Sequence, residues 1–259
     1  MECLKRISLV LSFLLVAMCC STAFAHEFII KPVQLTVAKD HVVPFSIVSA
    51  HVFMISEEME PIDQVETKLF LDGKTTQLNL AENKMLMTLD GQIKPEAEGT
   101  AIIAGHRKGM IWTQTTKSWK QQSKKGLKGV IRSGKYEKFC KTLVNVGKAD
   151  GSYNKVLGQR LEIIPMSDPT KAEVGQEIEF QTLLDGKPVS VESMAATYDG
   201  FSQTPNTFAY FTEPYGNGIT KLKITAPGTW MVRVQHVDKT SNPDYDSHVM
   251  RSVLVFEVK

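Results

Sequence analysis

The sequence predicts an all-β protein made of two β-sandwich-like domains, the C-terminal one immunoglobulin-like. Three observations favour this fold class. Short apolar and β-branched segments recur along the chain, and turn pairs such as Asp72-Gly73 and Asp185-Gly186 separate them. Roughly seven such segments follow residue 165, which is typical of an immunoglobulin-like sandwich.

The first 25 residues predict a cleaved secretory signal. The basic pair Lys5-Arg6 precedes an apolar run from Ile7 to Met18, and Ala23 and Ala25 stand at the small-residue positions that signal peptidase reads. The apolar run has 12 residues, which is too short to span a membrane. We therefore expect a periplasmic protein whose mature chain begins at His26.

The composition of the mature chain limits the partners and the stabilising interactions that we expect. Removing residues 1–25 leaves 28 Lys and Arg against 27 Asp and Glu, and a single cysteine, Cys140. This balance argues against a nucleic-acid partner and against a charged membrane surface. One thiol cannot form an intramolecular disulfide, so hydrophobic cores must stabilise the remaining 234 residues.

Residues 26–165 form the first predicted domain. The segment 42–54 alternates with a two-residue period that puts His51 on the same face as its apolar neighbours Phe45, Ile47 and Phe53. Two hairpins are expected, one turning at Asp72-Gly73 and one at Asp90-Gly91. A further strand is expected at 100–104.

A basic stretch follows within the same domain. Residues 107–148 contain twelve Lys and Arg but one acid, Glu137. Apolar residues recur there at helical spacing, which predicts a short amphipathic helix near 134–146. The basic side chains indicate a solvated surface, with an anionic partner as the alternative.

Residues 166–259 form the second predicted domain, which follows a strand expected at 160–165. Each expected strand is short and most are bounded by a turn signal, as in Asp185-Gly186-Lys187-Pro188 and Pro227-Gly228. The strands are expected at 177–184, 189–198, 208–211, 219–224, 229–237 and 249–258.

The histidines are the candidate functional residues. An N-terminal His26 would offer two ligands, its α-amine and its ring Nδ1. His51, His236 and His248 fall on inward strand faces near strand ends, where a histidine is either a satisfied core residue or a metal ligand. Nitrogen ligands suit Ni²⁺, Co²⁺, Cu²⁺ and Zn²⁺ rather than Ca²⁺ or Mg²⁺. His41 and His106 complete the six.

Several short motifs together resemble one family. They are Ala25-His26-Glu27-Phe28, Ala50-His51-Val52-Phe53, Tyr136-Glu137-Lys138-Phe139-Cys140-Lys141, Val146-Gly147, Leu161-Glu162-Ile163-Ile164-Pro165, Asp168-Pro169, Gly175-Gln176, Leu184-Asp185-Gly186-Lys187-Pro188 and Pro227-Gly228-Thr229-Trp230 through His236. In this layout the chain resembles the periplasmic components of ABC-type cobalt/nickel transport systems, otherwise described as a domain of unknown function.

The resemblance implies a β-rich protein outside the cytoplasm that captures a transition metal and passes it to a membrane importer. Its ligand positions carry over to His26, His51 and His236. Two positions depart from the family pattern. Ala50 stands where many relatives have glycine, and Ile29-Ile30 stands where an aromatic residue often follows the N-terminal stretch.

We therefore expect a metal-binding protein without catalytic activity, with His26, His51, His236 and His248 as ligands. Ni²⁺ or Co²⁺ is the expected ion, with Cu²⁺ or Zn²⁺ as alternatives. Two other functions remain open. One is a copper protein with a histidine brace and an oxidative or chaperone role, and the other is a structural β-sandwich that binds no metal. No serine–histidine–aspartate context or glycine-rich phosphate loop favours a hydrolase or nucleotide enzyme.

Overall fold

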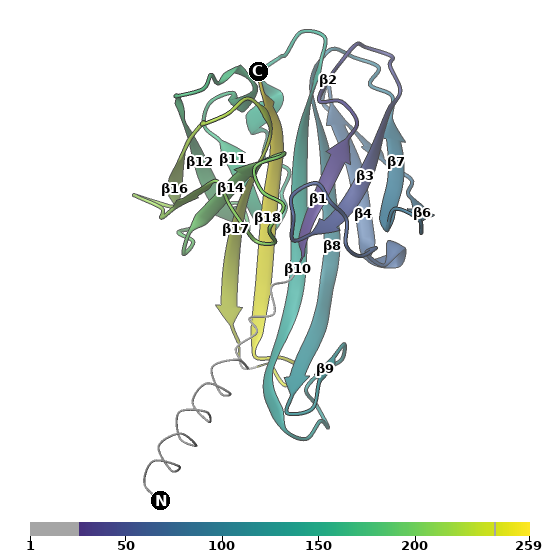
Figure 1. Cartoon of the computed structure of the whole chain (residues 1–259), viewed down its shortest axis with the longest axis vertical. Coiled ribbons are helices and arrows are strands. Elements are labelled where there is room, and N and C mark those ends of the chain that lie inside the picture. The colour runs from purple at the N-terminus through teal and green to yellow at the C-terminus, as the bar shows by residue number, and fades with distance from the viewer. Residues whose placement is uncertain (1–25, 241) are drawn as a thin grey trace, which may run out of the picture.

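The computed structural model describes residues 26–240 and 242–259, and it confirms an all-β architecture (Figure 1). The predicted signal peptide lies outside the described residues. Within them the helical segments are short 3₁₀ turns, at Ile62–Gln64, Ser152–Asn154 and Pro169–Lys171. No helix in this part of the chain has the length and apolar character needed to cross a membrane.

A large ten-stranded sheet forms the middle of the molecule. Along its main path the strands follow the order β15 (Tyr210–Thr212), β14 (Met194–Tyr198), β17 (Gly228–Lys239), β18 (Ser247–Val258), β10 (Val130–Val146), β8 (Gly99–Thr115), β4 (Val65–Leu71) and β5 (Lys74–Gln77). Two short strands are added at its sides, β2 (Thr36–Val37) on β10 and β9 (Trp119–Lys120) on β8.

Two four-stranded sheets complete the fold. The N-terminal small sheet has the order β1 (Glu27–Pro32), β3 (Val43–Ala50), β7 (Thr88–Ile93) and β6 (Ala81–Asn83). The C-terminal small sheet contains β11 (Leu161–Pro165), β12 (Glu177–Leu184), β13 (Lys187–Pro188) and β16 (Ile219–Lys223).

The two small sheets pack on opposite faces of the large sheet. One core cluster joins residues of the N-terminal small sheet, such as Phe28 and Phe45, to Cys140 and Val144 of β10. The other joins the C-terminal small sheet to the alternate β10 positions, Phe139 and Leu143. Because side chains alternate along a strand, neighbouring residues of β10 enter different cores. We call these the N-face and the C-face of the large sheet.

The predicted helix near 134–146 is wrong, because these residues belong to strand β10. Every residue from Glu137 to Val144 is buried. Because both faces of β10 are covered, apolar residues such as Phe139 and Cys140 stand next to each other, which hides the two-residue alternation. The charged residues in this run are buried in ion pairs, for example Lys141 Nζ with Glu162 Oε1 at 3.1 Å.

The predicted turns have mixed outcomes. Asp72-Gly73 joins β4 to β5 and Asp185-Gly186 joins β12 to β13, and all four residues have the positive φ that a tight hairpin requires. The turn expected at Asp90-Gly91 is wrong, because both residues lie inside β7 and pair with β3. A Cβ at Gly91 would come within 2.5 Å of the Phe45 ring, so glycine here permits packing rather than turning.

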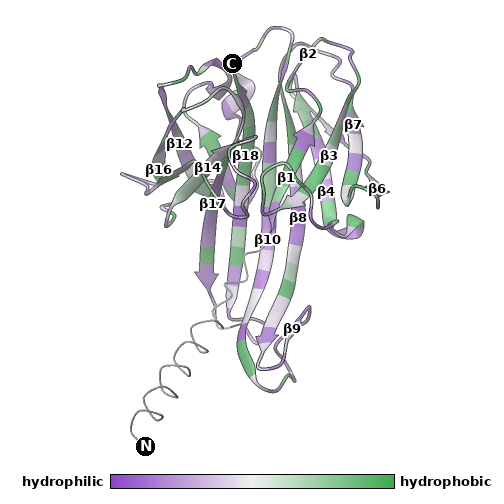
Figure 2. Cartoon of the chain, viewed as in Figure 1, coloured by the Kyte–Doolittle hydropathy of each residue, from purple (hydrophilic) through white to green (hydrophobic). Residues whose placement is uncertain are grey.

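The predicted domains share the large sheet. Parallel pairing of β10 with β18 joins the segment before residue 165 to the segment after it. No gap in the sheet therefore marks the boundary at residues 165–166. Figure 2 shows hydrophilic and hydrophobic bands following one another along β8, β10 and β18, which run from the packed part of the molecule to a protruding end.

Candidate metal centre

The pairing of β1 with β3 brings His26 and His51 together. Glu27, the first residue of β1, pairs with Ala50, the last residue of β3. His26 enters β1 at the point where His51 leaves β3, so the two side chains meet. Their ring centroids are 3.9 Å apart with 43° between the ring planes. His26 and His51 were predicted as ligands of one site, and the structure places them side by side.

The loop after His51 brings a carboxylate to this pair. Residues 51–57 fold back on β3, where Glu57 N donates to Ser49 O at 2.9 Å. Met54 takes a left-handed φ of 67° in this turn. The Glu57 carboxylate is then held by backbone amides, since its Oε1 accepts from His51 N at 2.9 Å and from Val52 N at 3.3 Å.

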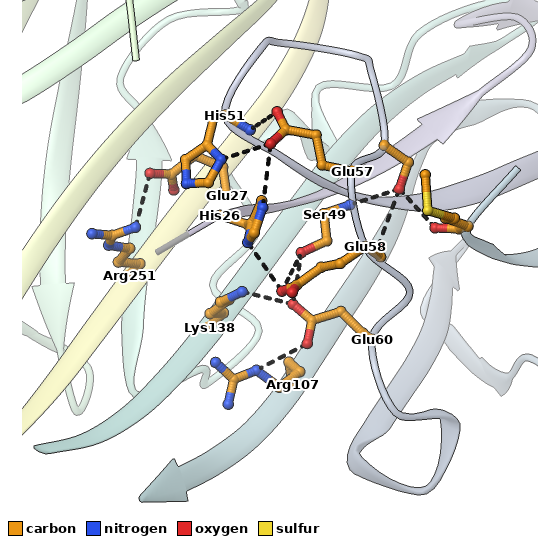
Figure 3. Close-up of polar contacts among 12 residues, drawn as sticks. His26, Glu27, Ser49, His51, Glu57, Glu58, Glu60, Arg107, Lys138 and Arg251 are labelled. Atoms are coloured by element: carbon orange, nitrogen blue, oxygen red, sulfur yellow. Dashed lines mark hydrogen bonds and ion pairs between the residues drawn. The ribbon is translucent and has the colours of Figure 1, made fainter. Parts of the chain in front are cut away.

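The other oxygen of Glu57 faces both imidazoles (Figure 3). Oε2 lies 2.8 Å from His51 Nδ1 and 3.4 Å from His26 Nε2. The three residues each offer a ligand atom, and these atoms lie within 4.8 Å of one another. We call His26, His51 and Glu57 the rim cluster, since all three side chains are partly exposed.

The spacing of the rim cluster fits a metal ion. Two ligand atoms bound about 2.05 Å from one ion are about 2.9 Å apart at a right angle and about 3.3 Å apart at the tetrahedral angle. The distances from Glu57 Oε2 to the two imidazole nitrogens, 2.8 and 3.4 Å, match these edges. Two imidazoles and one carboxylate are a donor set for borderline transition metals.

The charge of Glu57 also suits a cation. Burial tends to raise the pKa of this carboxyl, but hydrogen bonds from the His51 ring and from the His51 and Val52 amides outweigh burial and bring the pKa to about 2. Glu57 is therefore an anion over the whole neutral range. A carboxylate already ionised and oriented needs no proton release before it binds a metal.

Glu58 contacts the second nitrogen of His26. The Glu58 Oε1 atom lies 3.0 Å from His26 Nδ1, and this hydrogen bond is the main reason that the pKa of Glu58 is lowered. Nδ1 is the nitrogen that would join the α-amine in the chelate predicted from the sequence. Formation of that chelate would replace the contact between His26 and Glu58.

The residue after His26 anchors the site to the large sheet. Glu27 is buried, and its Oε1 accepts from Arg233 Nε at 2.9 Å and from Arg251 NH1 at 3.2 Å. Burial works to raise the pKa of Glu27, but the two guanidinium groups outweigh it and lower the pKa. Since Arg233 lies on β17 and Arg251 on β18, strands late in the chain fix the position of His26.

His236 and His248 do not join the rim cluster, and the expectation of one site with all four histidines must be corrected. His236 pairs with Met250 of the C-face core, whereas Arg233 and Arg251, at the alternate positions of the same strands, reach Glu27 on the N-face. The large sheet thus separates these two histidines from His26. His236 Nε2 instead contacts Asp238 Oδ1 at 2.8 Å.

His248 belongs to a second cluster on the C-face. Its Nε2 lies 2.7 Å from Glu137 Oε2, while His106 Nε2 lies 2.7 Å from Glu137 Oε1. Arg160 NH1 approaches His248 Nδ1 at 3.3 Å. We call His106, Glu137 and His248 the inner cluster, because Glu137 and His248 are buried.

Sequence reasoning missed Glu57. Its signal was the acidic run Glu57-Glu58-Met59-Glu60, which begins six residues after His51. Such runs are common on solvated loops, so composition alone did not distinguish this one. What distinguishes it is the return of the loop onto β3, which is a tertiary feature.

The fold and the site define a β-sandwich protein with a histidine–carboxylate cluster at the edge of its N-terminal small sheet. Comparison with protein families then places the sequence. Residues 23–238 match the family described as Domain of unknown function (DUF4198), and the chain belongs to that family. A search of curated protein sequences finds no match.

Solved structures with a similar arrangement are distant in sequence. The D0-D1 domain of intimin is 12% identical with a TM-score of 0.24, over 90% of this chain and 98% of that one. Murine CEACAM1b is 11% identical with a TM-score of 0.23, over 90% and 100% of the two chains. The Yersinia pseudotuberculosis adhesin InvE is 11% identical with a TM-score of 0.24, over 88% and 58%. Likenesses this distant carry no argument about function.

Proposed function

We propose that this protein is a periplasmic metal-binding protein that captures a divalent transition metal at the rim cluster and delivers it to a membrane importer. The convergence of His26 Nε2 and His51 Nδ1 on one oxygen of Glu57 carries this proposal. The proposal assigns no catalytic step to the protein. The importer and the periplasmic location follow from the family resemblance and from the signal predicted in residues 1–25.

The donor set supports a late first-row ion. Imidazole is a ligand for Ni²⁺, Co²⁺, Cu²⁺ and Zn²⁺, whereas Ca²⁺ and Mg²⁺ prefer sites made mainly of oxygen atoms. Cys140 is no competing soft ligand, because it is buried in the N-face core and burial raises the pKa of its thiol to about 12. We propose Ni²⁺ or Co²⁺ as the cargo, on the family resemblance.

The location of the cluster supports binding followed by release. His26 precedes the first strand, and in the mature form that we propose it is the terminal residue. A terminal residue can leave a metal without unfolding a strand, while Glu27 keeps β1 attached through its two arginines. The rim position also leaves the ion accessible to a partner protein.

Calorimetric titration of the protein beginning at His26 tests the proposal. We expect binding of one Ni²⁺ or Co²⁺ ion. Glu57→Gln should weaken binding at least tenfold, which is about 1.4 kcal/mol, and His51→Ala should weaken it by a hundredfold or more. The matched control is His41→Ala, which removes an exposed histidine away from the cluster. Equal affinity in the control and the cluster variants would contradict the assigned site.

One extra residue before His26 tests the α-amine. If this amine is a ligand, the extension should weaken binding tenfold or more, and N-terminal sequencing of the exported protein should begin at His26. Equal affinity of both forms would limit the site to side chains. Turnover of reductant by the copper-loaded protein would instead favour the oxidative copper role.

A further inference from the structure

A pocket of about 450 Å³ adjoins the rim cluster. His26 belongs to both, whereas His51 and Glu57 do not line the pocket, so a molecule in the pocket would reach a metal at the cluster from the His26 side. Away from His26 the wall is aromatic and thioether-rich. We call this the aromatic pocket, and its apolar wall includes Met59, Met110, Trp112, Trp119 and Tyr136.

The aromatic wall belongs to the long hairpin of β8 and β10. Cross-strand pairing places Met110 opposite Tyr136 and Trp112 opposite Gly134. Figure 1 shows this end of the hairpin, with β9, extending beyond the N-terminal small sheet, so that sheet does not cover it. Trp119 of β9 extends the aromatic wall.

Local contacts leave space for the Tyr136 ring and hold the end of the hairpin in place. A Cβ at position 134 would lie 3.0 Å from the Tyr136 ring, so Gly134 leaves room for that ring to lie along the strand. The loop that closes the hairpin is tied to the segment before β18. Ser123 Oγ donates to Asp244 Oδ1 at 2.7 Å, and Ser133 N donates to Asp246 Oδ2 at 2.8 Å.

The floor of the pocket carries buried charge. Lys138 Nζ binds Glu60 Oε1 at 2.6 Å, and Arg107 Nε lies 3.6 Å from Glu60 Oε2. All three side chains are buried, and the exposed carboxylate of Glu58 also faces the two cations. Figure 3 shows a series of polar contacts from His26 through Glu58 and Ser49 to this floor.

Arg107 is held in this floor by two hydrogen bonds and one long ion pair. Its side chain is 3% exposed, and its NH1 donates to Lys108 O and Tyr136 O. Its Nε faces Glu60 Oε2 at 3.6 Å, which is an ion pair but is beyond hydrogen-bond distance. A ligand carboxylate that approached Arg107 from the pocket would add a charge-assisted interaction to this long pair.

We infer that the aromatic pocket holds a small organic chelator, an aromatic or heteroaromatic carboxylate, which completes the coordination of the metal at the rim cluster. This inference rests on the proposed function. Three protein side chains leave coordination positions open on a four- or six-coordinate ion. The chelator's ring would pack on Trp112, Trp119 and Tyr136, and its carboxylate would face Arg107 and Lys138 in the floor.

Equilibrium dialysis with picolinate tests the inference. Picolinate is a heteroaromatic carboxylate that chelates through its ring nitrogen and carboxylate. Isonicotinate has the same ring and charge but cannot chelate. With Ni²⁺ present we expect the protein to retain one picolinate per chain, at least tenfold more tightly than without Ni²⁺ or than isonicotinate. Without added chelator, Ni²⁺ itself should still be retained.

Trp119→Ala should weaken picolinate retention at least tenfold and leave Ni²⁺ affinity within twofold. Phe211→Ala is the matched control, because it removes an exposed aromatic side chain from a different strand. Two of the three tryptophans line the pocket and Trp230 is fully buried, so tryptophan fluorescence gives a second readout of occupancy.

The outcomes separate the inference from the proposed function. Retention of Ni²⁺ without preferential retention of picolinate overturns the inference and leaves the metal site intact. Picolinate retained equally with and without Ni²⁺, or equally by Trp119→Ala, also overturns it. Failure to retain Ni²⁺ under any condition defeats the proposed function, and the inference with it.

Discussion

The rim cluster and the inner cluster have the same composition, two histidines and one glutamate, but they differ in geometry. In the rim cluster both imidazoles face a single oxygen of Glu57, at 2.8 and 3.4 Å. In the inner cluster each imidazole takes its own oxygen of Glu137, both at 2.7 Å. In the rim cluster the two imidazole nitrogens converge on one carboxylate oxygen. In the inner cluster the carboxylate of Glu137 bridges the two histidines through separate hydrogen bonds.

The two clusters also differ in how exposed they are. The rim cluster is partly exposed and adjoins a pocket. The inner cluster is largely buried, its His106 ring stacks on Phe139 with centroids 4.9 Å apart, and Arg160 places a positive charge next to His248. The comparison teaches that two clusters of the same residue types can differ in convergence and access, and these two properties favour the rim cluster as the candidate metal site.

Removing one imidazole from each cluster should give the largest difference in Ni²⁺ affinity. His51→Ala should weaken Ni²⁺ binding by a hundredfold or more, about 2.7 kcal/mol, because it removes one of three side-chain ligands. His248→Ala should change the affinity less than twofold, because the large sheet separates it from the ion. Calorimetry on both variants measures this, and comparable losses would mean that the clusters are not functionally distinct.

The free energy of unfolding should show the opposite order, with the larger loss in the inner cluster. Glu137→Gln should lower the free energy of unfolding of the metal-free protein by about 2 kcal/mol, because it weakens two charge-assisted hydrogen bonds in a buried setting. Glu57→Gln, at a partly exposed position, should lower it by less than about 0.5 kcal/mol. Urea denaturation measures both values. A larger loss in Glu57→Gln would assign the rim cluster a structural role.

Acid should remove the contribution of Glu137 to the stability of the folded protein. Burial raises the pKa of this carboxyl, but hydrogen bonds from His106 and His248 outweigh burial and lower the pKa below its ordinary value of 4.5. A lowered pKa means that the stabilisation is fully present above pH 4.5 and is lost as the pH falls below that value. The stability gap between wild type and Glu137→Gln should therefore narrow from pH 7 to pH 3, and a constant gap would contradict this account.

A small effect on stability should come from Arg160. Its pairing with Asp185 is exposed, so Arg160→Gln should cost less than about 1 kcal/mol in urea denaturation. The variant should still bind one Ni²⁺ per chain, because the two imidazoles of the inner cluster remain on separate oxygens. Binding of a second ion would show that the charge of Arg160, rather than geometry, keeps the inner cluster free of metal.

Local features of the sequence predicted much of the fold. The hairpin at Asp72-Gly73 and the turn at Asp185-Gly186 were recognisable because left-handed turn residues act over a few positions. The helix near 134–146 could not be excluded, because β10 is covered on both faces and its alternation is hidden. A turn was wrongly predicted at Asp90-Gly91, because the glycine there makes room for the Phe45 ring and does not form a turn.

The candidate site was predictable in part. His26 and His51 were predicted as ligands from the signal junction and from the face of a strand, and the structure places their side chains together. His236 and His248 were correctly expected on inward faces, but the sequence does not say on which side of a middle sheet an inward face lies. Glu57 was missed because its place depends on a loop that folds back onto β3.

By itself, the sequence determined the all-β character, the ends of many strands and the chemical nature of the available ligands, because these depend on neighbouring residues. Tertiary structure decided which ligands meet. The contact of His26 with His51 requires the register of β1 on β3, and the position of Glu27 requires arginines more than 200 residues away. Convergence of a site is a property of long-range pairing, and short patterns in the chain do not encode it.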